Sequence, residues 1–322
     1  MADGAHFTFH DLGHAQESFR DAVLAGLMRP RKSIPCKFLY DERGSALFEE
    51  ICRLPEYYPT RTEIAILERN APDIAARMGP QCCLVEFGSG ASHKARILLE
   101  ALERPAAYVA VDISREHLRE ATASLAEDFP ALAVIAVCAD YTRPFRLPSL
   151  PGRVEKRIGF FPGSTIGNFE PDEAEAFLVN CRRLLGPDGD MIIGVDLKKD
   201  PDILDAAYND RAGITAAFNL NLLERARREL GAAIDVDRFA HVAFYSEARG
   251  RVEIYLKSLV DQEVRIAGAP IRFAAGELIH TEYSYKYSIA EFRRLARHAG
   301  FHPVETWTDR GELFSVHYCE AG

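Results

Sequence analysis

One stretch of this sequence constrains the fold more than any other, because it combines a buried strand, a glycine turn and a helix. The apolar residues 82–85 lead to Glu86, and Gly88-Ser89-Gly90 follows one residue later. Residues 95–102 then have the composition of a helix. Glycines at such a point allow a sharp turn off the strand and a close approach of a ligand to the backbone. The stretch therefore predicts a nucleotide-cofactor site at the carboxyl edge of a sheet.

The residues around this turn indicate which cofactor to expect. A dinucleotide fingerprint has a third glycine where this sequence has His93. An acid, Glu86, precedes the first glycine, and Asp112 ends the next predicted strand 22 residues after Gly90, which suits an acid that binds ribose hydroxyls. A Gly-x-Gly pair also occurs in plain turns, but the two strand-end acids favour S-adenosylmethionine (SAM) and match the pattern of SAM-dependent methyltransferases.

Strand-like and helix-like segments alternate from residue 82 onward. Apolar runs predict strands at 82–87, 107–112, 132–138, 157–161 and 190–196, with helices between them at 93–103, 115–128 and 171–185. This alternation predicts an α/β fold in which helices cover both faces of a mainly parallel sheet. We therefore expect a Rossmann-like class I SAM-dependent methyltransferase domain.

Two further strand ends carry polar residues that suit a methyl-transfer site. Asp140 and Tyr141 follow the third predicted strand, where an acid could bind the adenine amine beside an aromatic wall. A lone Asp at a strand end is more often a cap or a turn, but three acids in register favour the cofactor. Asn168 follows the fourth strand and could hold a nucleophilic amine; alternatively it caps the helix that begins near Pro171.

The remaining segments suggest a second, β-containing substrate domain or lid. Leu54 to Arg61 contains two tyrosines between two prolines, which predicts an irregular loop with Tyr57 or Tyr58 facing a ligand. Residues 62–77 and 200–232 look helical, and 234–273 contain alternating strands. We predict a helical lid segment at 1–60, a SAM-binding domain at 61–197, a substrate-binding insertion at 198–285 and a return to the main sheet at 286–322.

Composition excludes several classes of protein. A net charge of −9 argues against nucleic acid as a partner, because no excess of basic residues neutralises phosphates. No apolar run approaches the roughly 18 residues that span a bilayer, so we expect no membrane association. The seven cysteines have no metal-binding spacing and are interpreted as buried reduced thiols. We expect a cytoplasmic monomer without a metal.

Nearly the whole chain resembles a known family, the ergothioneine-pathway L-histidine Nα-methyltransferases. The similarity extends from about residue 19 to 318, and five blocks in the same order make it more specific than any single motif. The blocks are Tyr40-Asp41-Glu42-Arg43-Gly44-Ser45, Leu54-Pro55-Glu56-Tyr57-Tyr58-Pro59-Thr60-Arg61, Glu86-Phe87-Gly88-Ser89-Gly90, Phe161-Pro162-Gly163-Ser164-Thr165-Ile166-Gly167-Asn168 and Thr281-Glu282-Tyr283-Ser284.

The resemblance implies three methyl transfers from SAM to the α-amino group of L-histidine, giving the betaine hercynine and S-adenosyl-L-homocysteine. It assigns Tyr57, Asn168 and Tyr208 to the amine and carboxylate of the amino acid, and Glu282 with Ser284 to its imidazole. Phe48, Gly163 and Ile254 match positions that line the substrate pocket. The implied SAM contacts are Gly88, Lys94, Asp112, Asp140 and Tyr141, with Tyr40 beside them. The pattern of an acid followed by Gly-x-Gly adds Glu86 and Gly90 to the predicted cofactor residues. Tyr40, Tyr57 and Asn168 are the implied catalytic residues.

The chemistry of these residue types agrees with the resemblance. Methyl transfer requires an aligned amine lone pair, so positioning supplies most of the acceleration. Glu282 can accept an imidazole N–H, and Ser284 suits the other ring nitrogen as donor or acceptor. Ile254 replaces a methionine of the best-known relatives, and tyrosines 283, 285 and 287 should point to the opposite face from Glu282. Both departures affect the expected substrate range rather than the reaction.

Two other functions remain open at this point. The same fold could methylate another aromatic amino acid, such as tryptophan, or a thiohistidine. Tryptophan offers a single N–H donor and no acceptor, which disagrees with the pair Glu282 and Ser284. A catalytically silent sensor of SAM or an amino acid is the alternative from a different class. Formation of S-adenosylhomocysteine in the presence of histidine would distinguish an enzyme from a sensor.

Overall fold

The computed structural model describes residues 7–12, 17–90 and 92–322, which form two compact units. Unit 1 contains the described residues before 17, together with Pro59–Lys198 and Tyr287–Gly322. Unit 2 contains Glu17–Tyr58 and Lys199–Lys286. Residues 1–6 and 13–16 of the predicted N-terminal segment, and Ala91 after the glycine turn, lie outside the described residues.

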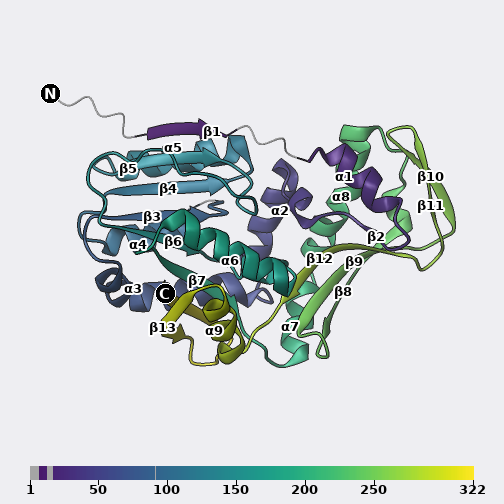
Figure 1. The fold of residues 1–322 in the computed structure, drawn as a ribbon. Helices are drawn as coiled ribbons and strands as arrows, with labels where there is room; N and C mark the ends of the chain where they lie inside the picture. The colour runs from purple at the N-terminus through teal and green to yellow at the C-terminus, as the bar shows by residue number, and fades with distance from the viewer. Residues whose placement is uncertain (1–6, 13–16, 91) are drawn as a thin grey trace. The chain divides into compact units, whose positions relative to one another are not determined.

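Unit 1 is built on a sheet of eight strands among the described residues, in the order β1-β5-β4-β3-β6-β7-β14-β13 (Figure 1). The first six of these run parallel, whereas β14 and β13 are antiparallel to their neighbours. The strands are β1 (Phe7–Asp11), β3 (Cys82–Phe87), β4 (Ala107–Asp112), β5 (Ala133–Cys138), β6 (Lys156–Phe161), β7 (Asp190–Asp196), β13 (Phe301–Thr308) and β14 (Phe314–Ala321).

The strand order reverses at β3, which places the glycine turn at the centre of the unit. From β3 the chain proceeds to β4 and β5 on one side, and it then returns to place β6 and β7 on the other. In open α/β sheets, ligands bind at the carboxyl ends of the strands at such a reversal point. The predicted cofactor residues after β3, β4 and β5 therefore lie at one edge of the sheet.

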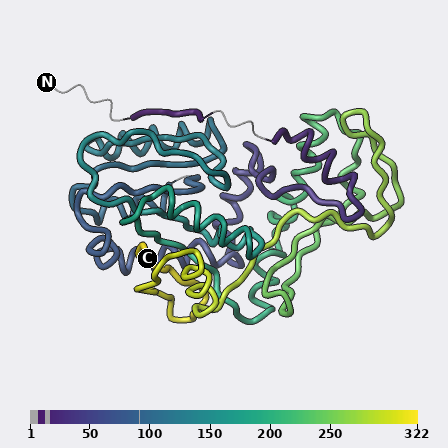
Figure 2. The backbone as a smooth tube through the Cα atoms, in the orientation of Figure 1, coloured from purple at the N-terminus to yellow at the C-terminus, as the bar shows by residue number. Residues whose placement is uncertain are grey.

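Helices cover both faces of this sheet, as the alternating pattern predicts. One face packs against α3 (Tyr58–Met78), α4 (His93–Ala101) and α5 (Arg115–Asp128), whose buried residues share a core with alternate side chains of the strands. The other face packs against α6 (Pro171–Leu185) and α9 (Ile289–His298). The chain leaves unit 1 after β7 and returns to it at Tyr287 to form α9, β13 and β14 (Figure 2).

Two elements of unit 1 differ from the sequence-based expectation. Helix α3 begins at Tyr58 rather than at residue 62, so the predicted loop ends at Tyr57. Pro59 is the second residue of this helix, where its missing N–H costs no helical hydrogen bond. Strand β1 was not expected; it pairs with β5 in parallel, from Phe7 opposite Val134 to Asp11 opposite Cys138.

Unit 2 combines a four-stranded sheet, a hairpin and helices around a separate core. The sheet order is β2-β12-β9-β8, and β10 pairs with β11 alone. Its strands are β2 (Lys32–Ser33), β8 (Phe239–Ser246), β9 (Arg251–Ser258), β10 (Gln262–Ile266), β11 (Ala269–Phe273) and β12 (Leu278–Tyr285). Its helices are α1 (Phe19–Leu27), η1 (Cys36–Leu39), α2 (Glu42–Arg53), α7 (Pro201–Tyr208), α8 (Ile214–Leu230) and η3 (Val236–Arg238).

The predicted helical region 200–232 is two helices, because Asp210 starts a new one. Its carboxylate accepts hydrogen bonds from the backbone N–H groups of Ile214 at 2.9 Å and Thr215 at 2.8 Å, in the first turn of α8. These are donors that a helix N-terminus otherwise leaves unsatisfied. Helix α7 therefore ends at Tyr208, which leaves that side chain next to β12.

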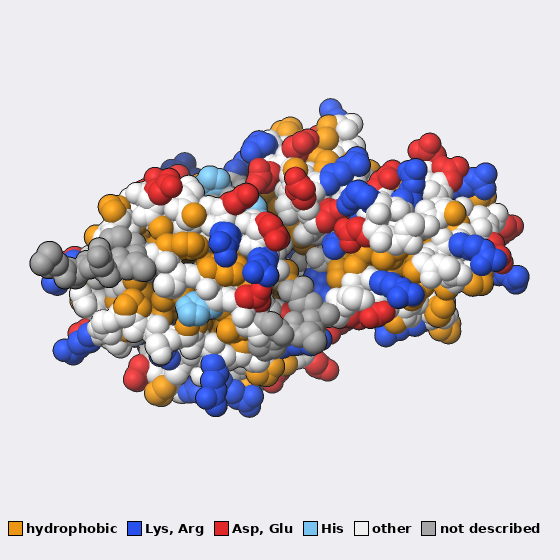
Figure 3. Space-filling model, turned by 90° about the horizontal axis from the view of Figure 1, so that it is seen from above, with side chains coloured by type: hydrophobic (Ala, Val, Ile, Leu, Met, Phe, Trp, Pro, Cys, Tyr) orange, Lys and Arg blue, Asp and Glu red, His pale blue; other side chains and the backbone are white. Residues whose placement is uncertain are grey.

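The surface carries both signs of charge. On the face that Figure 3 shows, Lys and Arg side chains are interspersed with Asp and Glu. Within the described residues, no helix is both long and apolar enough to span a bilayer. The same residues contain no cluster of three or more His, Cys, Asp or Glu suited to a metal ion.

Candidate active site

The glycine turn of unit 1 links the ends of β3 and β4. Gly88 and Gly90 have φ angles of +71° and +47°, in the left-handed region that favours glycine. The N–H of Gly88 donates to the carbonyl of Val111 at 2.8 Å, and the N–H of Gly90 donates to Asp112 Oδ2 at 3.4 Å. The turn thus brings together Gly88, Gly90 and Asp112, as the sequence predicts.

The Asp112 carboxyl is held by backbone groups on both sides. Its Oδ1 accepts the N–H of Ser114 at 2.8 Å, while Oδ2 faces Gly90. Burial raises the pKa of Asp112 above its ordinary value, and the bonds from Ser114 and Gly90 act in the opposite sense. A Cβ at Gly90 would meet no heavy atom within 4 Å, so the space beside this carboxylate is open to a ligand.

Glu86 is buried beneath the turn rather than at its surface. Tyr108 Oη donates a hydrogen bond to its carboxylate, and the same hydroxyl lies 3.0 Å from Ser92 Oγ. Burial raises the pKa of Glu86 to about 8. Glu86 therefore supports the segment between β3 and α4 from below, through Tyr108 and Ser92.

Asp140 and Tyr141 follow β5 as expected, and Asp140 forms a local turn. Asp140 Oδ1 accepts the N–H of Thr142 at 3.0 Å and its hydroxyl at 2.5 Å, while Arg143 Nε lies 3.7 Å from Oδ2. A Cβ at Gly88 would lie 3.5 Å from Tyr141 Oη, which places this tyrosine beside the glycine turn.

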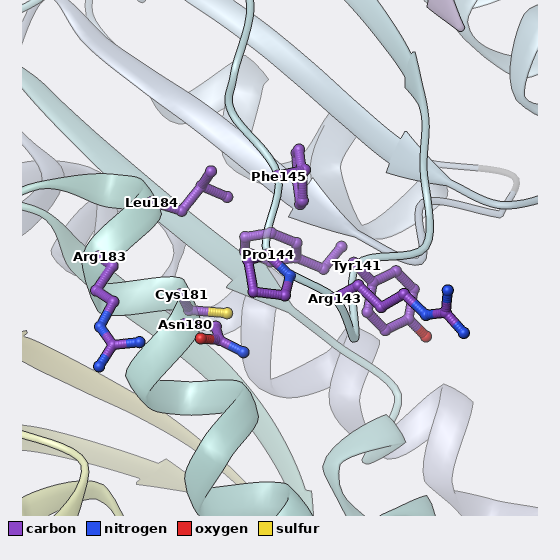
Figure 4. A pocket seen from close by; sticks show the side chains of 9 residues that line it. Tyr141, Arg143, Pro144, Phe145, Asn180, Cys181, Arg183 and Leu184 are labelled. Atoms are coloured by element: carbon purple, nitrogen blue, oxygen red, sulfur yellow. The ribbon is translucent and has the colours of Figure 1, made fainter. Parts of the chain in front are cut away.

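Tyr141 also borders a cavity of about 120 Å³. Its ring packs against Phe87, Phe161 and Phe177 at centroid distances of 6.4, 5.8 and 5.9 Å. Figure 4 shows the cavity between the segment after β5 and helix α6, which contributes Asn180 and Cys181. Small-molecule sites usually enclose about 300 Å³ or more, so this cavity is too small for a nucleoside cofactor.

Glu63, which was not predicted from the sequence, connects helix α3 to three other parts of unit 1. Glu63 of α3 has no exposed surface, and its Oε2 lies 2.5 Å from Lys94 Nζ at the start of α4. Both Glu63 oxygens accept the N–H of Gly163, at 2.8 and 3.1 Å. A Cβ at Gly194 in β7 would lie 1.9 Å from Glu63 Oε1. The carboxylate is therefore enclosed by α3, α4, β7 and the segment after β6.

Asn168 ends the short helix η2 (Thr165–Asn168), two residues before the cap of α6. The cap is Glu170, whose N–H is bonded by Glu173 Oε2 at 3.0 Å, so the alternative role of Asn168 as an N-cap is wrong. Ser164 holds the start of η2, because its Oγ accepts the N–H of Asp196 at 2.9 Å. The half-buried side chain of Asn168 is thus not committed to helix capping.

Unit 2 gathers the predicted aromatic residues into one cluster. Tyr40 and Phe48 pack edge to face at 5.5 Å, Phe48 and Tyr57 at 6.3 Å, and Tyr57 and Tyr208 at 6.3 Å. These residues come from the segment before α2, from α2 itself, from the loop before α3 and from the end of α7. Phe218 of α8 closes the cluster against Tyr40 at 5.5 Å.

The surroundings of Tyr57 keep its hydroxyl protonated. Burial raises the pKa of Tyr57 well above 10, and the nearby hydroxyls of Tyr208 and Tyr40 and the carboxylate of Glu282 act in the same direction. At neutral pH this hydroxyl therefore donates or accepts hydrogen bonds. It is not ionised, so it cannot serve as a ready base.

One face of β12 carries Glu282 and Ser284, the residues predicted to bind the imidazole of the substrate. Glu282 lies opposite Ile254 in the register with β9, and Ser284 Oγ accepts a hydrogen bond from Tyr208 Oη at 2.8 Å. Tyr283 and Tyr285 instead contact Arg251, whose guanidinium lies 3.5 and 5.2 Å from their ring centroids. These tyrosines therefore occupy the opposite face, as the alternation along a strand predicts.

Neither Lys286 nor Glu63 was predicted from the sequence as a site residue, although both carry a recognisable signal. Lys286 continues the alternation of Glu282 and Ser284 by two residues and is only 2% exposed. Glu63 lies on the apolar stripe of α3 that continues through Ile66 and Leu67. A charged residue at an apolar position of a regular element seldom stays there without a partner.

The residues at the edge of unit 1 fit a SAM molecule. The open space at Gly90 admits a ligand to the backbone, and the Asp112 carboxylate beside it can accept hydrogen bonds from ribose hydroxyls. Tyr141 supplies an aromatic wall near Gly88. In unit 2, the aromatic cluster and the Glu282 face suit an amino acid with a polar ring.

Comparison with known proteins shows which proteins this chain is similar to. Residues 19–321 match the family described as histidine-specific, SAM-dependent methyltransferases. The chain is 41% identical over 307 residues to the Histidine N-alpha-methyltransferase of Mycolicibacterium smegmatis, which covers 94% of each chain. It is 37% identical over 311 residues to the protein of the same name from Mycobacterium tuberculosis, covering 95% of each chain.

A third similarity is to part of a longer protein. The chain is 34% identical over 304 residues to Ergothioneine biosynthesis protein 1 of Neurospora crassa. That alignment covers 91% of this chain but 34% of the fungal protein.

Proposed function

This chain belongs to the histidine-specific, SAM-dependent methyltransferase family, and we propose that it methylates the α-amino nitrogen of L-histidine three times to give hercynine, a step of ergothioneine biosynthesis. The observation that carries the proposal is the extent of the family match. It runs from residue 19 to 321, so the glycine turn of unit 1 and the Glu282 face of unit 2 both fall inside it.

In this proposal unit 1 binds SAM. Asp112 accepts hydrogen bonds from the ribose hydroxyls, Gly88 and Gly90 let the cofactor approach the backbone, and Tyr141 flanks the adenine with Asp140 beside it. Lys94 is a further contact to the cofactor, and Glu63 holds its ammonium in place. When bound, SAM supplies an electrophilic methyl group on a sulfonium.

Unit 2 binds the amino acid in the same proposal. Glu282 and Ser284 recognise the imidazole, and Tyr57 and Tyr208 orient the amine and carboxylate. Phe48 and Ile254 line the pocket. Because the raised pKa of Tyr57 keeps its hydroxyl neutral, Tyr57 orients the amine without adding a charge.

Each transfer forms one N–C bond and breaks one S–C bond, leaving S-adenosylhomocysteine. The amine must present a lone pair, so its ammonium proton leaves to solvent before the first attack, and one further proton leaves before each later one. Binding and alignment of the amine supply most of the acceleration, since a well-oriented intramolecular reaction avoids a large entropic cost. The third transfer leaves a quaternary nitrogen without a proton, so the reaction ends there.

Mass spectrometry of the protein incubated with SAM and the twenty amino acids tests the proposal. We expect a gain of three methyl groups on histidine alone, with S-adenosylhomocysteine formed in a threefold molar amount. Methylation of tryptophan instead would contradict the roles of Glu282 and Ser284. Absence of any methyl transfer would favour a sensor that binds SAM without catalysis.

We also propose that the protein works as a monomer in the cytoplasm. Five of the cysteines are buried free thiols, which suits a reducing compartment: Cys82, Cys83, Cys138, Cys181 and Cys319. Light scattering of the purified protein measures its mass directly, and a value near twice 35.9 kDa would contradict the monomer.

A further inference from the structure

Three side chains in unit 2 form a closed hydrogen-bonded triangle on the face of β12 that carries Glu282. Lys286 Nζ lies 2.8 Å from Tyr208 Oη and 2.8 Å from Ser284 Oγ, and Tyr208 Oη lies 2.8 Å from Ser284 Oγ. Lys286 is 2% exposed, Ser284 5% and Tyr208 9%, so water does not compete freely for these bonds. We refer to these three residues as the Lys286 triangle.

The direction of each bond in the triangle is fixed by the available protons. The ammonium of Lys286 only donates, so both hydroxyl oxygens accept from it. Tyr208 then donates its one proton to Ser284. Ser284 Oγ therefore accepts two hydrogen bonds, which uses both of its lone pairs. Its own proton must point out of the triangle, and Ser284 can act on anything in front of it only as a donor.

From this geometry we propose that Lys286 makes the site selective for the neutral imidazole of histidine. The inference rests on the proposed function, in which Glu282 and Ser284 contact the two ring nitrogens. A neutral ring has one N–H and one lone pair, and it satisfies Glu282 as acceptor and Ser284 as donor. Histidinium carries N–H groups on both nitrogens, so one of them would face the Ser284 proton.

Lys286 acts in this scheme as a positioning residue, because it works through Ser284 and not by touching the substrate. The ring tautomer is fixed as well, with its proton on the nitrogen that faces Glu282. A buried N–H that meets another donor loses its hydrogen bond and gains electrostatic repulsion. The positive charge of Lys286 acts in the same direction against histidinium.

Several other titratable groups surround the triangle. Tyr57 and Tyr40 belong to the aromatic cluster, Glu282 lies on the same strand, and His241 of β8 contacts the carbonyl of Tyr208 at 2.9 Å. Burial raises the pKa of Tyr57 and lowers the pKa of His241, so both stay neutral near pH 7. A pH effect on binding must therefore be separated from ionisation of Glu282.

Calorimetric titration of histidine into the wild-type protein saturated with S-adenosylhomocysteine tests the selectivity. Below the imidazole pKa of about 6.5, we expect histidine affinity to fall about tenfold for each pH unit, with release of a proton on binding. Equal affinity at pH 5.5 and 7.5, or uptake of a proton, would overturn the proposal. This titration uses the wild-type protein, so its result does not depend on whether a variant folds.

Two variants assign the effect to Lys286. In Lys286→Met, Ser284 regains a lone pair and can accept from histidinium, so the roughly tenfold loss of affinity expected between pH 7.5 and 5.5 should largely disappear. Lys286→Arg keeps a donor and should retain the wild-type profile. A uniform loss at every pH in Lys286→Met would indicate a purely structural role and contradict the proposal. An unchanged profile in this variant would assign the pH effect to Glu282 instead.

The outcomes also separate this inference from the proposed function. If histidine gains no methyl group at any pH, the function itself is wrong. If histidine is methylated but its binding does not follow the ring proton, the function stands and only the role of Lys286 is wrong.

Discussion

Glu63 Oε2 lies 2.5 Å from Lys94 Nζ, although Glu63 has no exposed surface and Lys94 is the second residue of the helix that follows the glycine turn. The same carboxylate accepts the N–H of Gly163. A buried charge without its partner is costly, so the pair holds α3, α4 and the segment after β6 in one arrangement.

Glu63→Gln should weaken both the fold and SAM binding. The amide keeps an acceptor for Gly163 but leaves Lys94 without this counter-charge, so we expect a loss of about 3 kcal/mol in unfolding free energy. The SAM dissociation constant should rise by roughly tenfold, about 1.4 kcal/mol. Urea unfolding and calorimetry measure the two effects. The control is Glu68→Gln on the same helix, where the side chain is exposed; equal behaviour of both variants would contradict the role of Glu63.

Gly194→Ala tests the contact of the Glu63 carboxylate with β7. A methyl group at this position would lie 1.9 Å from Glu63 Oε1, so Glu63 or β7 must move. We expect a loss of about 1–3 kcal/mol from overpacking. Because the two changes act on one contact, the double variant with Glu63→Gln should lose less than the sum of the single losses. Strict additivity in urea unfolding would count against a shared contact.

Glu282→Ala should impair histidine binding without affecting the cofactor. Loss of a charged hydrogen bond to the ring N–H costs ~2 kcal/mol or more, which raises the histidine KM by at least about 30-fold. SAM affinity should stay within twofold. Tyr283→Phe is the matched control, since its ring packs on Arg251 at the opposite face of β12. An unchanged KM in Glu282→Ala would refute the proposed ring contact.

Asn168→Ala should reduce kcat while SAM affinity stays nearly intact. Since Glu170 and not Asn168 caps α6, the change should also leave the stability of the fold within about 0.5 kcal/mol of wild type. Steady-state kinetics and thermal unfolding provide these measurements. A defect confined to SAM binding would instead place Asn168 in the cofactor site.

Glu86→Gln should change how stability depends on pH. The pKa of Glu86 in the folded protein is about 8, above its ordinary value of 4.5, so the folded state holds an extra proton between these values. Its contribution is therefore complete below pH 4.5 and is lost as pH rises through about 8. A pKa difference of one between the folded and unfolded protein corresponds to about 1.4 kcal/mol, so the loss amounts to several kcal/mol.

The glutamine side chain resembles the protonated acid and does not titrate. Between pH 5.5 and 8.5, the unfolding free energy of wild type should thus fall relative to that of Glu86→Gln, measured by urea unfolding at each pH. Parallel profiles for the two proteins would show that Glu86 does not titrate in this range.

Local sequence patterns predicted most of unit 1. Strands 82–87, 107–112 and 190–196 were predicted with the bounds that the structure has, because continuous apolar runs between turn residues are typical of strands buried on both faces. The early start of α3 was missed because prolines 55 and 59 were both interpreted as loop residues, whereas Pro59 fits the first turn of a helix. Strand β1 was missed because its partner β5 lies more than 120 residues away, which no local pattern reveals.

The candidate site was predictable in its types of residue but not in the contacts that hold them. Gly88, Gly90 and Asp112 meet because parallel strands end at one edge, a rule that follows from the fold alone. The partnerships of Glu63 with Gly163 and of Lys286 with Tyr208 join residues about 100 and 78 positions apart. Such pairs depend on how α3 and α7 pack, so sequence spacing carries no direct signal for them.

The segment 199–286 leaves and re-enters unit 1 at adjacent points. Leu197 forms a parallel bridge with Tyr287, Lys198 N–H donates to the Tyr287 carbonyl at 3.0 Å, and Tyr287 N–H donates to Asp196 at 3.1 Å. A loop whose ends meet in this way can be replaced by one of another length without breaking the strands on either side. The length of segment 199–286 can therefore change without disturbing β7 or α9, whereas its core depends on residues 17–58, which complete unit 2.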